Sequence, residues 1–151
     1  MNVTITVEAA VEPTEDEKKV ERALLKLFPT GRADKKTEEG ITTGLVVRGT
    51  GLEFLSTLRN VIRQERIRTT ARAIFLRTSR EHMLHIYLNK QAAFMGRVSF
   101  CAPFGESPHG PISVSAETDD ISSLIDYLAA ARVADSTDVR RRGRTSYLDE
   151  E

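Results

Sequence analysis

The sequence predicts one α+β domain, in which a mixed five-stranded sheet carries helices on one of its faces. Segments of alternating apolar and polar residues predict strands, and apolar residues at helical spacing predict amphipathic helices. Their order is strand, helix, strand, two helices, three strands and a final helix. The 151 residues suffice for one core. We expect this domain to span residues 1–131, and a flexible charged tail to cover residues 132–151.

The first strand and helix are marked clearly. Residues 2–11 alternate between apolar and polar side chains, which predicts a strand with one buried face. A helix follows, because Thr14 can cap the free amides while Glu17 reaches back to it, and Pro29 ends the apolar stripe. Residues 30–40 are polar and predict a mobile loop.

The middle of the chain predicts a strand and two helices. Residues 41–48 form the strand, and apolar residues at helical spacing run from Leu52 to Ile62. The helical pattern restarts after Glu65. A second helix, or a bent continuation of the first, should therefore run to about Leu76.

Three short segments in the second half alternate as strands do, namely residues 82–88, 97–100 and 112–116. Between the first two, residues 91–95 have room for about one helical turn, and Gly96 can adopt the positive backbone angle that ends it.

A final helix should begin after Thr118 or Asp119, either of which can cap it. The sheet face opposite the helices is polar, so it is either wet or covered by a partner. Its predicted side chains are Thr4, Thr6, Glu8, Tyr87, Arg97 and Ser99.

Composition limits the function classes. Lys plus Arg and Asp plus Glu number 22 each, so the chain as a whole has no positive field that would attract nucleic acid. The single Cys101 rules out an intrachain disulfide and fits a reducing compartment. Neither a signal peptide nor an apolar stretch of about 18 residues is present, so we expect a cytoplasmic protein outside the membrane.

No motif predicts catalysis, a cofactor or a metal. Residues 105–109 approach a nucleophile elbow but end in His109 instead of glycine. The turn at residues 49–51 lacks the third glycine of a dinucleotide fingerprint. His82 and His85 should project to opposite faces of a strand, where they cannot share a metal. We expect a protein without enzymatic activity.

The strongest local charge lies between residues 59 and 80. Seven arginines there meet one acid, Glu65, so seven minus one leaves six positive charges. Guanidinium groups suit bidentate contact with phosphate, whereas a solvated helix face balanced by the acidic first helix explains the same pattern. Both interpretations stay open at this level. The arginines are Arg59, Arg63, Arg66, Arg68, Arg72, Arg77 and Arg80.

Several segments resemble a known family. Residues 88–94 read Leu-Asn-Lys-Gln-Ala-Ala-Phe and residues 96–100 read Gly-Arg-Val-Ser-Phe, and Gly-Glu-Ser-Pro follows at 105–108 and Gly-Pro-Ile at 110–112. With Val-Glu-Ala at 7–9 and Pro-Thr-Glu-Asp-Glu at 13–17, they resemble an archaeal family of uncharacterised proteins labelled RNA-binding or exosome-related. The resemblance covers about residues 2–131, and the tail departs from it.

This resemblance implies a fold similar to that of the ribosomal large-subunit protein that binds 5S ribosomal RNA. It also implies a homodimer, no known enzymatic activity, and an RNA-processing complex as a source of protein partners.

Our leading hypothesis is a non-enzymatic protein that contacts structured RNA through phosphate-directed arginines. The chain lacks a GxxG clamp and the paired aromatics of an RNA-recognition sheet, so contact should be electrostatic. The alternative is a homodimeric protein-interaction module without RNA-binding activity. The candidate RNA contacts are Arg63, Arg66, Arg68, Arg72, Lys90 and Arg97.

Overall fold

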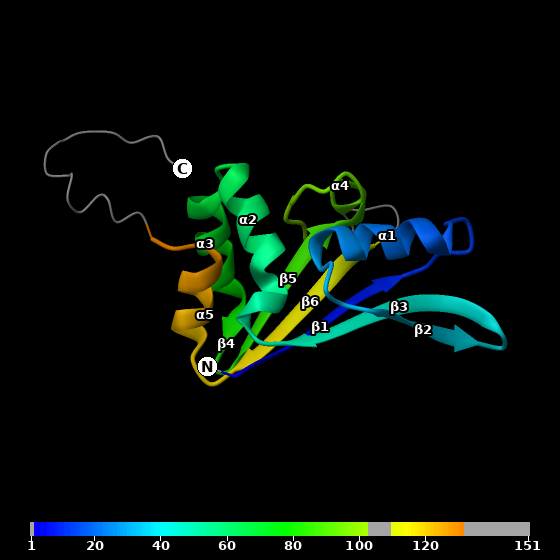
Figure 1. The fold of residues 1–151 in the computed structure, drawn as a ribbon, viewed down its shortest axis with the longest axis horizontal. Coiled ribbons are helices and arrows are strands. Elements are labelled where there is room, and N and C mark those ends of the chain that lie inside the picture. Colours follow the sequence, from blue (N-terminus) through cyan, green and yellow to red (C-terminus); the bar gives the residue numbers. More distant parts are fainter. Residues whose placement is uncertain (1, 103–109, 132–151) are drawn as a thin grey trace, which may run out of the picture.

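Six strands form one antiparallel sheet in the order β2-β3-β1-β6-β5-β4 (Figure 1). The computed structural model describes residues 2–102 and 110–131. The α+β class is confirmed, whereas the prediction of a mixed five-stranded sheet was wrong. The strands are β1 (Val3–Ala10), β2 (Ala33–Glu38), β3 (Ile41–Thr50), β4 (Ser79–Arg80), β5 (Met83–Asn89) and β6 (Pro111–Thr118).

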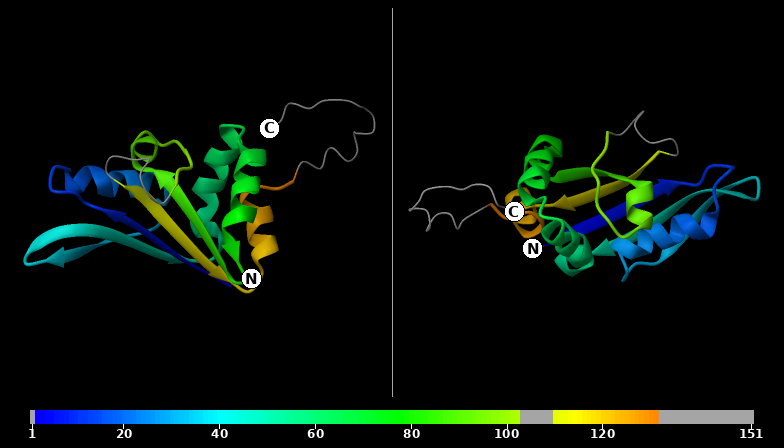
Figure 2. Two further views of the ribbon diagram at one scale, coloured as in Figure 1. Left: turned by 180° about the vertical axis from the view of Figure 1, so that it is seen from behind. Right: turned by 90° about the horizontal axis from the view of Figure 1, so that it is seen from above.

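The helices gather on one face of the sheet in two groups (Figures 1 and 2). Helices α1 (Glu17–Leu27) and α4 (Lys90–Phe94) pack together over one end. Over the other end, a 3-10 turn, η1 (Leu52–Leu55), leads into α2 (Ser56–Gln64), which packs with α3 (Arg68–Thr78) and α5 (Ile121–Leu128). We call these the α1–α4 end and the arginine end.

The core lies between the sheet and these helices. Every second residue of β1 is buried, as its alternation predicts, and the apolar stripes of α1 and α2 are buried in the same core. The predicted core positions Leu84, Ile86, Leu88, Val98, Ile112 and Val114 are all buried, while Phe100 is half-buried.

The predicted loop over residues 30–40 is in fact edge strand β2, which forms a hairpin with β3. Glu39 and Gly40 make the two-residue turn with φ angles of 53° and 81°, and two successive positive angles match the right-handed twist of the strands. The strand carries no apolar alternation because its side chains are mostly exposed. Its pairing with β3 depends on backbone hydrogen bonds, and the pattern of hydrophobic residues in a sequence does not reveal these bonds.

The prediction of a strand at residues 97–100 was also wrong. Only an isolated bridge joins Leu88 to Phe100, while the Ser99 carbonyl accepts from the Asn89 amide at 2.8 Å. The segment therefore covers the edge of β5 without forming a regular ladder. The predicted helical turn before it is confirmed as α4, and Gly96 has a φ of 76°.

Aspartates cap the first and last helices instead of the predicted residues. Asp16, not Thr14, accepts the Lys18 amide at 2.9 Å at the start of α1. Asp120, not Thr118 or Asp119, accepts the Ser123 amide at 3.1 Å at the start of α5. Threonine and aspartate side chains can both accept hydrogen bonds from the first amides of a helix. Where several such residues precede a helix, the sequence alone therefore leaves the cap uncertain by one or two residues.

The turn at residues 49–51 serves packing. A Cβ built on Gly49 would lie 2.1 Å from the ring of Phe54, which stacks on Phe28 with ring centroids 5.6 Å apart. Gly49 is needed so that this aromatic pair can close over the strand. Helix η1, which follows the turn, is only four residues long.

No described element covers the opposite face of the sheet (Figure 2). Thr4, Glu8 and Tyr87 lie on it as predicted, whereas Arg97 and Ser99 follow α4 outside the strands. Within residues 2–102 and 110–131, no helix is long and apolar enough to cross a membrane. The predicted tail and the loop at residues 105–109 lie outside the described residues.

Candidate nucleic-acid interface

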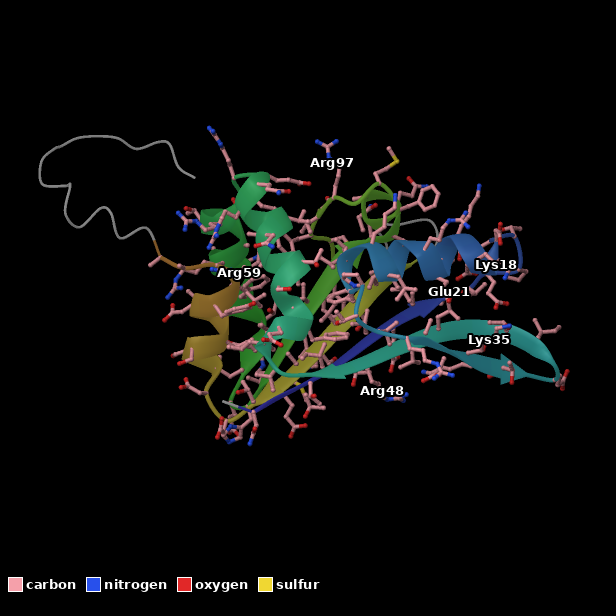
Figure 3. All side chains as sticks on the ribbon, in the orientation of Figure 1. Lys18, Glu21, Lys35, Arg48, Arg59 and Arg97 are labelled. Carbon is pink, nitrogen blue, oxygen red and sulfur yellow. The ribbon has the colours of Figure 1, made fainter. Side chains whose placement is uncertain are left out.

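Four arginines of α2 and α3 surround the last turn of α5. Arg59 and Arg63 are four residues apart on α2, as are Arg68 and Arg72 on α3, so each pair shares one side of its helix. Figure 3 labels Arg59 on α2, where its guanidinium lies 4.9 Å from the ring centroid of Tyr127 on α5. Such stacking holds the guanidinium in place.

Arg72 joins α3 to α5. Its Nη1 lies 2.6 Å from Oδ1 of Asp126 and also donates to the carbonyl oxygen of Ala129 at 3.0 Å. Ala129 is the C-cap residue of α5, so the positive charge stabilises the negative end of that helix. Arg72 therefore has a structural role in addition to any contact with a ligand.

The other three arginines of this group line a small hollow of about 70 Å³. Its remaining lining residues belong to α5 and the residues after it, and Asp126 is the acid among them. Four arginines around this turn against one aspartate leave three positive charges. The arginine hollow is lined by Arg59, Arg63, Arg68, Asp126, Tyr127, Leu128 and Ala130.

Arg66 and Arg97 lie at the C-terminal end of α2. Arg66 is exposed in the turn between α2 and α3, where its φ is 60°. Arg97, labelled in Figure 3, follows α4, and its Nε lies 3.7 Å from the Glu65 carboxylate at the C-cap of α2. The structure thus brings Arg63, Arg66, Arg68 and Arg72 together on α2, α3 and the turn between them, whereas Arg97 reaches the C-cap of α2 from the segment after α4.

Lys90, the sixth predicted contact, is buried at the α1–α4 end. Its Nζ donates to the Ala10 carbonyl at 2.8 Å and contacts both carboxylate oxygens of Glu15 at 3.1 and 3.2 Å. A hollow of about 380 Å³ lies beside this pair, between α1 and α4. Because the ammonium holds α4 to the β1–α1 connection, it does not belong to the exposed arginine group.

Arg59 and Tyr127 are the residues that sequence reasoning missed. Arg59 precedes the chosen Arg63 by one helical turn, and that spacing was the available signal. Tyr127 comes from a helix more than sixty residues away in the chain, so its contact with Arg59 is a tertiary feature.

Three groups whose pKa values shift lie outside the hollow. A hydrogen bond from Lys35, whose Nζ is 2.9 Å from the carboxylate, lowers the pKa of Glu17, and the same contact raises the pKa of Lys35. Hydrogen bonds from the Ser123 hydroxyl and amide lower the pKa of Asp120. These acids lie at helix starts. Within the described part of the chain, no group of three His, Cys, Asp or Glu residues could hold a metal.

Comparison with known proteins agrees with the fold. A family model described as RNA binding matches residues 4–118. A UPF0201 protein of Methanothermobacter thermautotrophicus is 40% identical over 126 residues, which cover 83% of this chain and 89% of the relative. One from Aeropyrum pernix is 37% identical over 132 residues, 87% of each chain.

Solved structures agree as well. The crystal structure of the UPF0201 protein from Methanococcus jannaschii aligns with a TM-score of 0.75 and 27% identity, over 85% of this chain and 93% of that one. A second UPF0201 crystal structure gives a TM-score of 0.73 and 30% identity, over 85% and 94%. The predicted resemblance to an archaeal family labelled RNA-binding is thereby confirmed, and the chain belongs to the UPF0201 family.

Proposed function

We propose that this protein binds structured RNA without catalysing a reaction, and that the arginine end holds the RNA phosphates. The observation that carries this proposal is the group of four arginines around the last turn of α5, where a single aspartate offsets their charge. Guanidinium groups bind phosphate oxygens in a bidentate geometry, which lysine cannot match.

The family model described as RNA binding supports this proposal, although it names neither the RNA nor the contacting residues. Contact should be with phosphates in structured RNA, because single-strand binders offer exposed aromatic rings on which bases stack. At the arginine end the ring of Tyr127 is already occupied by Arg59. The likeness to the ribosomal 5S-RNA-binding protein and a partner in an RNA-processing complex stay predictions.

The test is fluorescence anisotropy with a labelled RNA hairpin at increasing salt. At about 50 mM salt we expect a Kd near the micromolar range that is typical of non-specific phosphate contact. The double change Arg63→Ala and Arg68→Ala should lower the slope of log affinity against log salt by roughly two, one for each lost contact.

The matched control is the double change Arg77→Ala and Arg80→Ala, which removes two exposed arginines from the other end of α3 and from β4. It should leave most of the slope intact. Arg68 with Arg72 is a poorer pair, since losing Arg72 also breaks contacts with Asp126 and Ala129. Absence of binding by the wild type, or an unchanged slope in the Arg63 and Arg68 variant, would show that the arginine end is not the RNA site.

The open sheet face favours a second candidate function, a homodimeric protein-interaction module without RNA-binding activity. This face includes a hollow of about 430 Å³ near Glu8, Lys36 and Tyr87. A second copy of the chain could cover it, since two-fold association is the commonest form of oligomer. Light scattering would then give twice the chain mass of 16.9 kDa. A monomer at about 50 µM would exclude a dimer of ordinary micromolar affinity.

A further inference from the structure

We propose that the arginine hollow is a seat for one terminal phosphate group of an RNA strand. The proposal rests on the proposed function, because it assigns one particular RNA group to part of the arginine end. It concerns Arg59, Arg63 and Arg68, which line the hollow together with the last turn of α5.

The size of the hollow fits a single small group. Its volume is about 70 Å³, whereas the hollows at the α1–α4 end, on the open sheet face and beside η1 measure about 380, 430 and 310 Å³. Pockets that enclose whole small molecules have roughly 300–1,000 Å³. The arginine hollow is also more enclosed than the other three. A phosphate group fits this space, and a nucleoside does not.

The charge around the hollow favours an anion, because its three guanidinium groups exceed the partial negative charge at the C-terminal end of α5. Arg59, Arg63 and Arg68 line it, and the carboxylate of Asp126 is engaged by a fourth arginine at 2.6 Å. A terminal phosphate carries a charge of about −1.5 to −2 near neutral pH, whereas a backbone phosphate carries one negative charge. The terminal group therefore offsets more of the repulsion among the guanidinium groups and offers three terminal oxygens as hydrogen-bond acceptors.

The start of α3 would also accept an anion. Arg68 is the first residue of this 11-residue helix, which has no side-chain cap at its N-terminus and no acid in its first turn. Helix α2 likewise has neither a side-chain cap nor an acid in its first turn, whereas α1 and α5 each have an aspartate cap. A phosphate in the hollow would supply α3 with the negative charge that a helix N-terminus favours.

One of the groups is already positioned. The guanidinium of Arg59 is stacked on Tyr127, so less conformational entropy is lost when it binds. Arg66, exposed two residues before Arg68, could reach the next phosphates of the strand. An RNA end therefore fits better than an isolated phosphate ion, which would use the hollow alone.

The experiment compares one RNA hairpin in three forms, with a 5′-phosphate, with a 3′-phosphate or with hydroxyl groups at both ends. The fluorophore sits in the hairpin loop, and the full chain is titrated at constant ionic strength. At least one phosphorylated form should bind about tenfold more tightly than the hydroxyl form, which is the effect expected of one or two additional charge-assisted hydrogen bonds.

Arg68→Gln should remove this preference, and Arg68→Lys, which keeps the charge but not the bidentate geometry, should remove most of it. Arg77→Gln is the matched control and should retain the preference, because Arg77 lies nine residues further along α3, roughly 13 Å along its axis. Thermal unfolding of each variant verifies that the fold is intact.

Equal affinity for all three forms would overturn this proposal and leave the proposed function standing, whereas failure to bind any form would overturn both. Inorganic phosphate alone is the remaining arm. If about 10 mM phosphate raises the Tm of the wild type but not of Arg68→Gln while the RNA forms bind equally, the hollow takes free phosphate and the assignment to an RNA end is wrong.

Discussion

Positive charge is buried and paired at one end of the helical layer, whereas it is in excess of negative charge at the other end. At the α1–α4 end Lys90 is 5% exposed, and its ammonium contacts the Glu15 carboxylate at 3.1 Å. At the arginine end four guanidinium groups meet one aspartate around the last turn of α5. A basic residue thus becomes a candidate for binding an external anion where the fold leaves its charge both reachable and in excess.

Among the substitutions that test this difference between the two ends, Lys90→Ala should lower stability the most. It leaves the Glu15 carboxylate, whose side chain is 12% exposed, without its ammonium partner. Removing one member of a buried pair costs about 3–5 kcal/mol of the free energy of unfolding. The Tm, measured by circular dichroism, should fall by about 10 °C or more.

The control is Arg97→Ala. In the wild type the Arg97 side chain is 71% exposed, and its Nε lies 3.7 Å from the Glu65 carboxylate. Exposed ion pairs contribute about 0–1 kcal/mol, so its Tm should change little. A Lys90→Ala protein as stable as the wild type would mean that the two ends do not differ in the way described.

Arg72→Ala should have an intermediate effect on stability. It should also distinguish a structural arginine from an RNA-binding one within the arginine end. It removes one hydrogen bond to the Ala129 carbonyl and one partly exposed pair with Asp126, together worth about 1–2 kcal/mol of stability. Arg68→Ala should change stability by only about 0.5 kcal/mol or less, as surface substitutions usually do, yet weaken RNA binding. Urea unfolding and anisotropy on both variants would measure this contrast, and equal losses of stability would contradict it.

The smallest predicted effect concerns the acids at the starts of α1 and α5. The folded protein lowers the pKa of Asp120 from its ordinary value of 3.8, so the cap stabilises the protein above that pH, and its contribution is lost as pH falls through the lower folded value. Asn caps helices as well as Asp but does not titrate. The Tm of Asp120→Asn should therefore fall less than that of the wild type when the pH is lowered from about 5 to about 3.

Glu17 at the start of α1 offers the matching measurement, because Lys35 lowers its pKa in the same direction. Glu17→Gln should likewise flatten the acid side of the stability profile. Identical profiles for the wild type and both variants would show that these contacts contribute nothing to the dependence on pH.

Much of the fold follows from local pattern. The alternation of β1, β5 and β6 and the stripes of α1, α2 and α5 predict both the elements and their buried residues, because one apolar face must leave water in each. Strand β2 escaped prediction because it lies at the sheet edge with mostly exposed side chains. Residues 97–100 alternate without forming a ladder, since they meet β5 at an isolated bridge.

For the candidate site, the sequence by itself determined that positive charge gathers between residues 59 and 80, and that α2 and α3 carry it. Only the tertiary structure decided which charges are in excess. It buried Lys90 against Glu15, paired Arg72 with Asp126, and placed Arg59, Arg63 and Arg68 around the end of α5. The physical reason is that neutralisation depends on distances between residues far apart in the chain, and side-chain periodicity along one helix does not determine them.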